Sequence, residues 1–585
     1  MTKFAMMVTE KSLKILSTGK PGTVAERCEE VLRQVDRNQM VLEMVFFLGE
    51  NEFESGETVI HEECESFFGK ALPMITVIAQ KPFRSTLTAE VLYLRGDGTV
   101  EFHDDYLLIR SGKDEELITK GIRFPEKGDT ACQAKAVFGR VGEILKDEGF
   151  KIDDIVRQWN YIDDITGVHD GVQNYQLFND ERSAFYAAAK WENGYPAATG
   201  IGCSAGGVTV SVHAVRNAGR FSRPIDNPIQ VPAHRYSGKV LEDGREKSKT
   251  TPKFERGRLL GDTVLISGTA AIKGESSSPS SDPRKQSEEA IEVIDSLVAP
   301  GNIHPGCKSF TPEALRVYIK REEQAETIIN TLQRRWSDVP IHFLSADICR
   351  PELLLEIEGK GSVKRFLECC CTDAFEASEA QAGGAGRVEL CEDLPCGGVT
   401  PSEDIIRQVM TAVDIPVNVL IRPRGGDFVY DEKEIQATLE SIRMCRHLGV
   451  NGVVIGALRK DGSIDMETMR RLMDTAKGME ITFHRAFDEC ADPFAALEDI
   501  ISLGCDRLLT AGHAENVNDG KDTLKDLNEK AAGRIIILAG SGVRPSNISD
   551  LESLTGISEF HSSSHGPDGR TDRRVVREMV TTVVY

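Results

Sequence analysis

Long apolar segments are missing from this sequence. No part of the 585 residues reaches the roughly 18 uninterrupted apolar residues of a membrane-spanning helix, so we expect no contact with a membrane. The 14 cysteines show no Cys-x-x-Cys spacing, which argues against a zinc ribbon and against a disulfide scaffold. The first residues contain too short an apolar stretch for a secretory signal. Together these absences predict a cytoplasmic protein whose cysteines are reduced.

Positive charge is also scarce, because 70 lysine and arginine residues stand against 92 acidic residues, for a net charge of −22. General nucleic-acid binding needs a basic face, so we do not expect it, although a local basic pocket for a small anion is compatible with this charge. The chain also contains no P-loop, no Gly-x-Gly-x-x-Gly after a strand, no His-Glu-x-x-His and no Gly-x-Ser-x-Gly. We therefore predict no organic cofactor.

The chain changes character near residue 360. Before that point, strand-like segments such as 86–95 alternate with longer helical stretches such as 131–147, a pattern typical of an α+β region. The sequence Gly-Lys-Gly-Ser at its end reads as short and flexible, and we place a linker there. The predicted division is a poorly assigned segment at 1–85, an α+β region at 86–358, a linker at 359–363 and a second domain at 364–585.

Eight short apolar strands follow one another in the second domain, each succeeded by an amphipathic stretch. Several of these stretches begin with helix-capping residues, for example Ser402 and Asp492. Eight β/α units in about 220 residues predict a TIM (β/α)8 barrel, whose functional groups lie at the C-terminal ends of its strands. The predicted strands are 365–371, 387–391, 416–421, 452–456, 480–484, 506–510, 534–539 and 558–562.

Ionisable side chains collect at the predicted strand ends of this barrel. Glu368 and Glu389 supply carboxylates and His484 supplies an imidazole, a set suited to moving a proton next to a carbonyl group. Arginines near the same ends would hold an anionic substrate, and glycine-rich turns in this fold often bind phosphate. Structural salt bridges are the alternative interpretation. The candidate substrate-binding residues of the barrel are Arg422, Arg424, Asp427, Arg485, Gly540 and Gly542.

Two cysteines, Cys370 and Cys391, fall on adjacent predicted strands. Strand alternation places Cys370 on the same face as Glu368, and Cys391 on the same face as Glu389. Thiolates select Cu(I) or zinc, whereas an isolated cysteine in a strand is usually a small core residue. The residues themselves leave both interpretations open.

A second group of candidates lies at the end of the α+β region. The segment DICRPELLLEIE places Cys349 and Glu356 seven residues apart, with Arg350 beside the cysteine. A carboxyl group that emerges from an apolar strand is partly desolvated, which raises its pKa and suits it to general acid catalysis. Arg350, Arg182 and Arg256 are candidates to clamp a dicarboxylate. The alternative is a glutamate at the edge of a strand, in a row that faces solvent.

Long motifs in the second domain resemble the CutC family. The strings IPVNVLIRPRGGDFVY, ITFHRAFDECADP and RIIILAGSGVRPSNI carry this resemblance, which extends over 364–564. It implies a TIM barrel associated with copper homeostasis and reported to bind Cu(I). Cys370 and Cys391 match the two cysteines proposed as ligands in some members.

Motifs in the α+β region resemble chorismatases, whose catalytic part is related to the RidA fold. The strings VRQWNYI, QNYQLFNDERSAFY and DICRPELLLEIE carry this resemblance. It implies that Glu356 protonates the enol-ether side of chorismate and releases pyruvate, and that Cys349 marks the branch that forms hydroxybenzoate. RidA-type imine hydrolysis is disfavoured, because Ile341 stands near the place of that family's substrate-binding arginine.

The two resemblances predict a fusion protein with two alternative functions. One is a copper-homeostasis protein that binds Cu(I) at Cys370 and Cys391. The other is a bifunctional enzyme acting on small anionic substrates, with a lyase or isomerase type of activity in the barrel. Both kinds of domain commonly self-associate, so we expect a homo-oligomer. The clustered ionisable groups disfavour a purely structural role.

Overall fold

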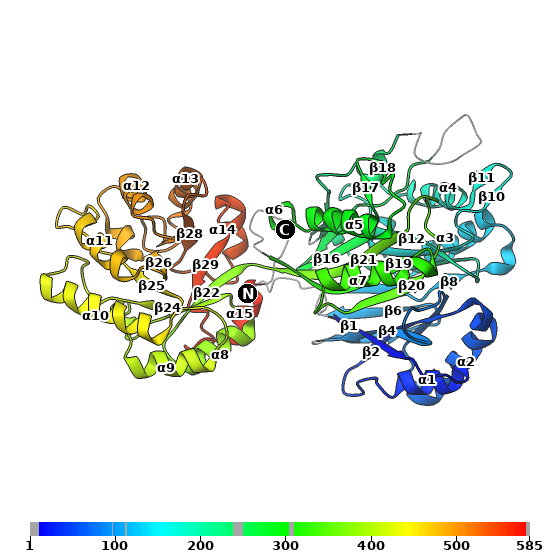
Figure 1. Cartoon of the computed structure of the whole chain (residues 1–585), viewed down its shortest axis with the longest axis horizontal. Coiled ribbons are helices and arrows are strands. Elements are labelled where there is room, and N and C mark those ends of the chain that lie inside the picture. Colours follow the sequence, from blue (N-terminus) through cyan, green and yellow to red (C-terminus); the bar gives the residue numbers. More distant parts are fainter. Residues whose placement is uncertain are drawn as a thin grey trace. The chain divides into compact units, whose positions relative to one another are not determined.

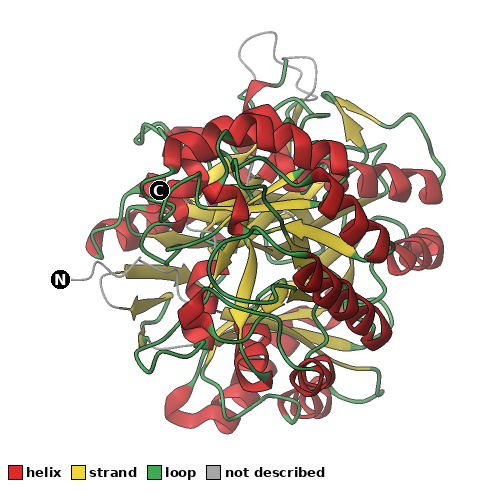
Figure 2. Cartoon of the chain, turned by 90° about the vertical axis from the view of Figure 1, so that its left-hand side faces the viewer, coloured by secondary structure: helices red, strands yellow, loops and turns green. Residues whose placement is uncertain are grey.

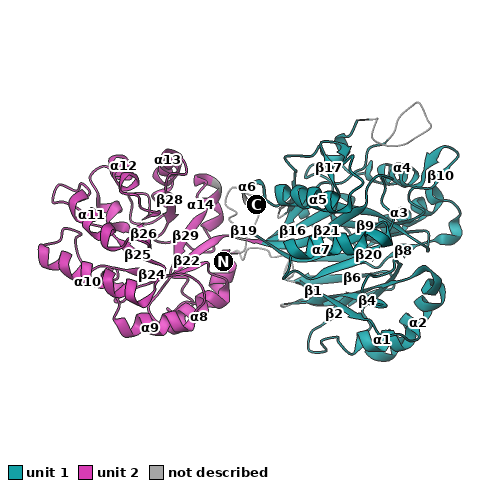
Figure 3. Cartoon of the chain, in the orientation of Figure 1, with its two compact units in different colours: residues 1–303, 310–362, 583–585 teal, residues 304–309, 363–582 magenta. Residues whose placement is uncertain are grey.

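The computed structural model describes residues 11–95, 98–111, 114–220, 222–237, 250–303 and 309–580. The chain forms two compact units, which are coloured separately in Figure 3. The first unit comprises Met1–Ile303 and Phe310–Ser362, and the second comprises Val363–Thr582. Among the helices that the structure describes, none is long and apolar enough to cross a membrane.

The segment 1–85 could not be assigned well from the sequence. Its described part, together with β4, forms a four-stranded sheet with two helices (Figure 1, dark blue). Both helices bury apolar residues against this sheet, including Cys28 and Val31 of the first helix and Ile60 of the second. The strand order is β1-β4-β2-β3. The elements are β1 (Lys11–Thr18), α1 (Val24–Leu32), β2 (Val41–Leu48), α2 (Glu50–Phe68), β3 (Met74–Ala79) and β4 (Leu87–Leu94).

A larger sheet follows in the order β12-β9-β13-β7-β6-β5, with β8 paired to β13. The predicted helix at 131–147 is observed as α3, and its apolar side packs on the residues of β13. The helix α4 belongs to the same core. The elements are β5 (Thr99–Phe102), β6 (Tyr106–Ser111), β7 (Asp114–Thr119), β8 (Ile122–Arg123), α3 (Thr130–Asp147), β9 (Ile155–Asp163), β10 (Val168–His169), β11 (Val172–Gln173), α4 (Asn174–Tyr186), β12 (Ala197–Cys203) and β13 (Val208–Val215).

A third sheet, in the order β14-β15-β16-β21-β19-β20, completes the first unit. Its central strand β21 carries Glu356, so the candidate acid is positioned by hydrogen bonds to strands on both sides. The elements are β14 (Ser222–Ile225), β15 (Gly257–Leu260), β16 (Thr263–Thr269), β17 (Ile272–Lys273), β18 (Ser276–Ser277), α5 (Pro283–Leu297), α6 (Pro300–Ile303), β19 (Ser309–Ile319), α7 (Ala325–Arg335), β20 (Ile341–Ser345) and β21 (Leu355–Lys364).

The segment 359–363, predicted as a flexible linker, instead lies inside β21. Gly359 and Gly361 are needed here because the neighbouring strand β19 lies too close for a side chain. A Cβ atom on Gly359 would lie 2.6 Å from the carbonyl oxygen of Ala314, and one on Gly361 would lie 2.4 Å from the ring of Phe310. The boundary between the two units does fall here, at Ser362 and Val363, but the segment is a strand, where glycine also marks close approach of another backbone.

The second unit is a closed barrel of eight parallel strands in chain order, as predicted. Figure 2, in which this side of the chain faces the viewer, shows helices around the strands. The strands are β22 (Phe366–Cys371), β23 (Arg387–Leu390), β24 (Val417–Leu420), β25 (Gly452–Ile455), β26 (Glu480–Phe483), β27 (Arg507–Thr510), β28 (Ile536–Ala539) and β29 (Glu559–Ser562). The helices are α8 (Ala374–Gly383), α9 (Glu403–Ala412), α10 (Glu432–Leu448), α11 (Met466–Thr475), α12 (Pro493–Leu503), α13 (Lys521–Ala531), α14 (Ile548–Thr555) and α15 (Arg573–Val580).

Strand alternation divides the side chains of the barrel strands into two sets. Leu367, Cys369 and Cys371 belong to the large apolar core that includes residues of the surrounding helices. Cys370 belongs instead to a small separate cluster with residues of β24 and β25. Because side chains alternate between the faces of a strand, the polar residue Glu368 lies on the same, inner side as Cys370.

Candidate functional site

Glu356 is a buried carboxyl group that keeps its proton at neutral pH. Only 6% of its surface is exposed. Burial and the neighbouring charge of Glu358 raise its pKa to about 8, against the opposing effect of Arg256 and Arg350. A Cβ atom on Gly268 would lie 1.9 Å from its Oε1 atom, so the absent side chain there makes room for the carboxyl group. Such a group is suited to donate a proton.

Cys349 and Tyr175 lie close enough to Glu356 for their charges to influence one another. Burial, followed by the charge of Glu356, raises the pKa of Cys349 to about 12. Burial also raises the pKa of Tyr175. The carbonyl oxygen of Cys349 accepts a 3.1 Å hydrogen bond from Gln173 Nε2. The site therefore presents a neutral thiol and a neutral phenol beside a protonated carboxyl group.

The three arginines proposed as a dicarboxylate clamp all bond to neutral oxygen atoms. Arg182 donates to Asn179 Oδ1, and Arg256 donates to the carbonyl oxygen of Val231 and to the hydroxyl of Tyr236. Arg350 donates to the carbonyl oxygen of Glu275 and to Ser277 Oγ. Within the described parts of the chain, none of the three forms an ion pair with a carboxylate. Their positive charges are thus left for an anionic ligand.

Two of these guanidinium groups also contain a buried donor atom without a hydrogen-bond partner in the described part of the chain. The Nε atoms of Arg182 and Arg256 are buried and have no hydrogen-bond partner in the described residues. The same holds for Nδ2 of Asn179, which lies one turn before Arg182 on α4. Buried donors without partners are costly, and in native structures they often mark a place where a ligand or water binds.

Sequence reasoning missed Tyr175 and Asn179. Together with Arg182 they follow one another at intervals of four and three residues, which places them on one face of α4. All three are buried. A buried helix face that carries a phenol, an amide and a guanidinium is unusual for a core, and that periodic signal was available in the string YQLFNDER.

The barrel brings the two predicted metal ligands together. The Sγ atoms of Cys370 and Cys391 lie 3.4 Å apart, and 7% and 1% of the two residues are exposed. The contact with Cys391 and burial raise the pKa of Cys370 well above its ordinary value. No third His, Cys, Asp or Glu of the described residues places a ligand atom within 4.8 Å of both sulfur atoms.

The two cysteine sulfur atoms suit some of the metals that thiolates select better than others. Tetrahedral zinc requires four ligands, and only two sulfur atoms are present. Cu(I) prefers soft sulfur donors, so the cysteine pair fits Cu(I) better than zinc. The raised pKa means that a metal ion must displace protons from the thiols to bind.

Glu368 and Glu389 are both buried, and Glu389 is the last residue but one of β23, near its C-terminal end. Glu368 is fully buried, and it accepts a hydrogen bond from Arg387 while its Oε1 lies 2.8 Å from His561 Nδ1. Burial favours a higher pKa for Glu368, but Arg387 and His561 outweigh it and lower the pKa to about 2. Burial raises the pKa of Glu389 to about 7, since Glu368 opposes part of the effect of His561.

Glu368, Glu389 and His561 are the one group of three candidate metal ligands within 4.8 Å of one another in the described residues. Most of these side chains already have charged partners. Arg387 bonds to Glu368 and to Glu559, which also accepts from Arg507 at 3.0 Å. Arg507 pairs with Glu480 as well, at 2.7 Å. Burial lowers the pKa of His561, but the two glutamates outweigh it and raise the value. Glu389 lies 3.2 Å from His561, and its buried Oε2 accepts no hydrogen bond from the described residues.

His484 is neutral, because burial and the charge of Arg422 lower its pKa to about 3. Its Nδ1 accepts a hydrogen bond from the backbone N–H of Ala486, and its buried Nε2 has no partner among the described residues. Arg422 donates to the carbonyl oxygens of Cys396, Gly398 and Gly426, so it ties two loops together. The structure does not join His484 to the carboxylates in one ion network.

The other predicted anion-binding residues of the barrel are engaged locally. Arg424 pairs with Asp427 at 3.0 Å and with Glu434 at 2.5 Å, while Arg485 pairs with Asp488 at 2.8 Å. The backbone N–H of Gly540 donates to Thr510 O, and Gly542 has a positive φ of 81° that favours glycine. In this structure these positions take part in loop contacts, and their role in anion binding stays a prediction.

The fold and the two sites show that the chain combines two classes of domain. One is an α+β domain with a buried acid, and the other is a (β/α)8 barrel with a cysteine pair. The model of the CutC family matches residues 365–566, and the model of the chorismatase FkbO/Hyg5-like N-terminal family matches residues 95–214. Through its second unit the chain belongs to the CutC family. Its first unit contains a chorismatase-like domain.

Two curated CutC family proteins agree with the assignment of the barrel, and two solved structures are similar to parts of the chain. The CutC family protein of Parabacteroides distasonis is 50% identical over 203 residues, which are 34% of this chain and 84% of that protein. The CutC family protein of Porphyromonas gingivalis is 49% identical over 197 residues, which are 34% and 79%. A CutC structure from Streptococcus agalactiae has 31% identity and a TM-score of 0.33, covering 34% of this chain and 98% of its own. A chorismatase structure has 21% identity and a TM-score of 0.45, covering 61% and 99%.

Proposed function

We propose that the first unit is a chorismatase-type enzyme that converts chorismate to hydroxybenzoate and pyruvate. The observation that carries this proposal is Glu356, a buried carboxyl group with a pKa of about 8 beside arginines that lack anionic partners. Chorismate bears two carboxylates and an enol ether. The arginines would hold the carboxylates, while the acid would protonate the enol ether.

The atom balance of this reaction agrees with the groups present. Chorismate contains all the atoms of hydroxybenzoate and pyruvate, so the cleavage needs no co-reactant. Protonation of the enol-ether side chain makes pyruvate a leaving group, and loss of a proton from the ring then restores aromaticity. Glu356 supplies the first proton and, once ionised, is a base that can accept one. The neutral thiol of Cys349 contributes a small group without charge beside the reacting ring.

Release of pyruvate from chorismate by the full-length chain tests this proposal. Wild type is expected to release pyruvate, and Glu356→Gln is expected to lose this activity by a factor of about 10² to 10⁴, as for removal of a general acid. Glu326→Gln on α7 is the matched control, because Glu326 pairs with Arg84 at the surface and is expected to change nothing. Absence of pyruvate release by wild type, or full activity of Glu356→Gln, would overturn the proposal.

A second function, Cu(I) binding by the barrel, is favoured by the cysteine pair. Cys370 and Cys391 would bind one Cu(I) ion as cargo, as the copper-homeostasis association of the family suggests. Anaerobic titration against a chromogenic Cu(I) chelator is expected to give one ion per wild-type chain. The double variant Cys370→Ala with Cys391→Ala is expected to bind none. Cys445→Ala, a buried cysteine of α10, is the control, and copper affinity that survives the double change would refute this function.

The barrel geometry gives less support to a lyase or isomerase activity there. Glu368 is ionised and paired with Arg387 and His561, so it neither carries a proton to donate nor is free to accept one. Glu389, with a pKa of about 7, is the remaining carboxyl group of this cluster suited to exchange a proton. Arg424 and Arg485 hold neighbouring carboxylates of their own loops. These contacts leave the cysteine pair as the feature of the barrel with the clearest chemistry.

A further inference from the structure

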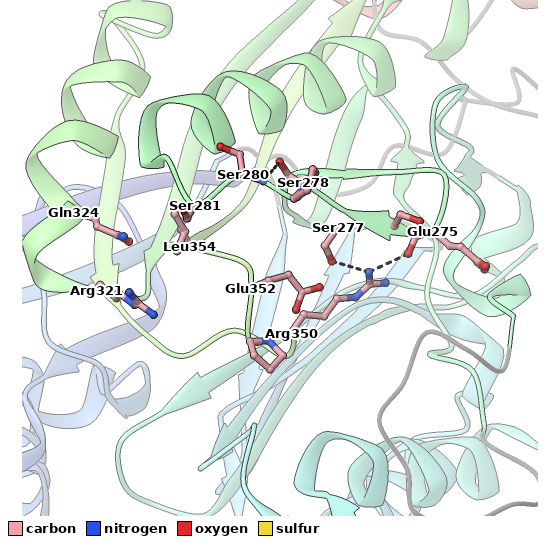
Figure 4. A pocket seen from close by; sticks show the side chains of 13 residues that line it. Glu275, Ser277, Ser278, Ser280, Ser281, Arg321, Gln324, Arg350, Glu352 and Leu354 are labelled. Carbon is pink, nitrogen blue, oxygen red and sulfur yellow. Dashed lines mark hydrogen bonds between the residues drawn. The ribbon is translucent and has the colours of Figure 1, made fainter.

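A pocket of about 640 Å³ lies in the first unit, and neither Glu356 nor Cys349 lines it. Figure 4 shows its walls, which come from the serine-rich segment 275–281, from the loop 350–354, and from Arg321 with Gln324. Its volume is within the range of sites that bind small molecules. The strings that carry the two resemblances do not include residues 276–281 of this lining.

The lining is rich in hydrogen-bond donors. The guanidinium of Arg321 is exposed and forms no hydrogen bond or ion pair with the described residues. Arg350 uses one nitrogen atom for Glu275 O and Ser277 Oγ, which leaves its other N–H groups to donate. Ser278 Oγ and Ser280 Oγ each accept a backbone N–H, so their hydroxyl hydrogens are also left to donate. Donors of this kind bind oxyanions.

The pocket also contains available acceptors, one of which is the buried Oε1 of Gln324, without a hydrogen-bond partner among the described residues. Glu352 is exposed on the lining and has no ion-pair partner in the described chain. The second carboxylate of the lining, Glu275, already accepts hydrogen bonds from Ser237 N at 2.8 Å and from Ser237 Oγ at 2.6 Å. A simple anion would leave Glu352 unsatisfied and would be repelled by it. A ligand that carries hydroxyl groups as well as negative charge would satisfy both kinds of group.

We propose that this pocket binds a hydroxylated phosphate ester of the size of a sugar phosphate. The two arginines and the serine hydroxyls supply donors for the phosphate oxygens, and Glu352 accepts a hydrogen bond from a sugar hydroxyl. This site shares Arg350 with the proposed chorismate clamp, but neither Glu356 nor Cys349 lines it.

Arg350 connects the pocket to the Glu356 site. It follows Cys349 directly in the chain, and its guanidinium lies 5.3 Å from the centre of the Tyr236 ring. Arg256 lies 5.2 Å from the centre of the same ring and donates to its hydroxyl. A ligand that draws Arg350 into the pocket would therefore alter the surroundings of Glu356 and change the KM for chorismate. This consequence, unlike the binding itself, rests on the proposed function.

Isothermal titration of the full-length chain with glucose 6-phosphate and with inorganic phosphate tests the binding. Wild type is expected to bind glucose 6-phosphate more tightly than phosphate. Arg321→Ala is expected to weaken binding of glucose 6-phosphate by about tenfold or more, the cost of a lost charge-assisted hydrogen bond. Arg334→Ala is the matched control, because Arg334 is an arginine of α7 that does not line the pocket.

Glu352→Gln separates recognition of the phosphate group from recognition of the sugar hydroxyl groups. Removal of its charge is expected to strengthen phosphate binding and to reduce the preference for glucose 6-phosphate over phosphate. Absence of binding by wild type, or equal affinity of Arg321→Ala and wild type, would overturn the proposal. Binding without pyruvate release would count against the chorismatase function alone, whereas pyruvate release without binding would count against this pocket alone.

Discussion

Glu356 of the first unit and Glu368 of the barrel are both buried, yet their protonation states are opposite. The pKa of Glu356 is raised to about 8 and that of Glu368 is lowered to about 2. Burial acts in the same direction on both. The difference is that Arg387 and His561 bond to Glu368, whereas at Glu356 the charges of Arg256 and Arg350 only partly offset burial and the like charge of Glu358. Local counter-charges decide the outcome once water has been excluded.

The buried arginines near these two glutamates differ in the same way, in whether a carboxylate neutralises them. In the barrel, Arg387 and Arg507 bond to carboxylates that neutralise them. In the first unit, Arg182 and Arg256 bond to an amide, a carbonyl and a phenol, which do not neutralise them. A buried charge without a counter-ion is costly, so the second arrangement is the better candidate for a binding site.

The largest effect is expected from Glu368→Gln, which removes the buried carboxylate shared by Arg387 and His561. The change leaves Arg387 with Glu559 as its remaining buried partner, so it is expected to destabilise the barrel by about 3 kcal/mol. All three tryptophans, Trp159, Trp191 and Trp336, lie in the first unit. Circular dichroism should therefore show early melting of the barrel while tryptophan fluorescence melts as in wild type. A wild-type melting curve would mean that these ion pairs are not structural.

A smaller effect is expected from Gly268→Ala, which tests how far the position of the Glu356 carboxyl group matters. The new Cβ atom would occupy the position of Glu356 Oε1 and displace that carboxyl group. A misplacement of about 1 Å typically costs on the order of 10²-fold in rate, so pyruvate release should fall by that factor while fluorescence melting changes little. Gly274→Ala is the control, since a Cβ atom there meets no other atom within 4 Å, and its positive φ adds only local strain. Unchanged activity of Gly268→Ala would show that the position of Glu356 is not critical.

The smallest effect is a difference in pH dependence between the two units. The contribution of Glu356 to stability is fully present below about pH 4.5 and is lost as the pH rises through about 8, because the folded state holds a proton that the unfolded state has released. The contribution of Glu368 is present above about pH 4.5 and is lost as the pH falls toward 2. Fluorescence melting should therefore weaken on the alkaline side, and Glu356→Gln should remove this slope. An identical slope in that variant would assign it to other groups.

Several features of the molecule could be predicted because they depend on residues close together in the sequence. The eight barrel strands and the helices between them follow from hydrophobic periodicity and capping residues. The approach of Cys370 to Cys391 follows from strand alternation once neighbouring strands are parallel. The raised pKa of Glu356 follows from its position after an apolar run, LeuLeuLeu at 353–355.

Other features could not be predicted, because they depend on pairings across the fold. Glu368 was expected at the rim with a catalytic role, but its pairing with Arg387 and His561 comes from two other strands of the barrel. Arg424 and Arg485 were expected to bind substrate, and instead each pairs with a carboxylate within its own loop region. The spacing of charges in a sequence does not show which opposite charge a side chain meets.

The sequence by itself determined the two-part organisation, the barrel, the cysteine pair and the candidate acid, because periodicity and strand alternation are local properties of the chain. Only the tertiary structure decided which buried charges are neutralised. Arg387 reaches Glu368, so that carboxylate is ionised and structural, while Arg182 and Arg256 reach neutral oxygen atoms and Glu356 keeps its proton. The physical reason is that the energy of a buried charge depends on the few ångströms to its nearest counter-charge.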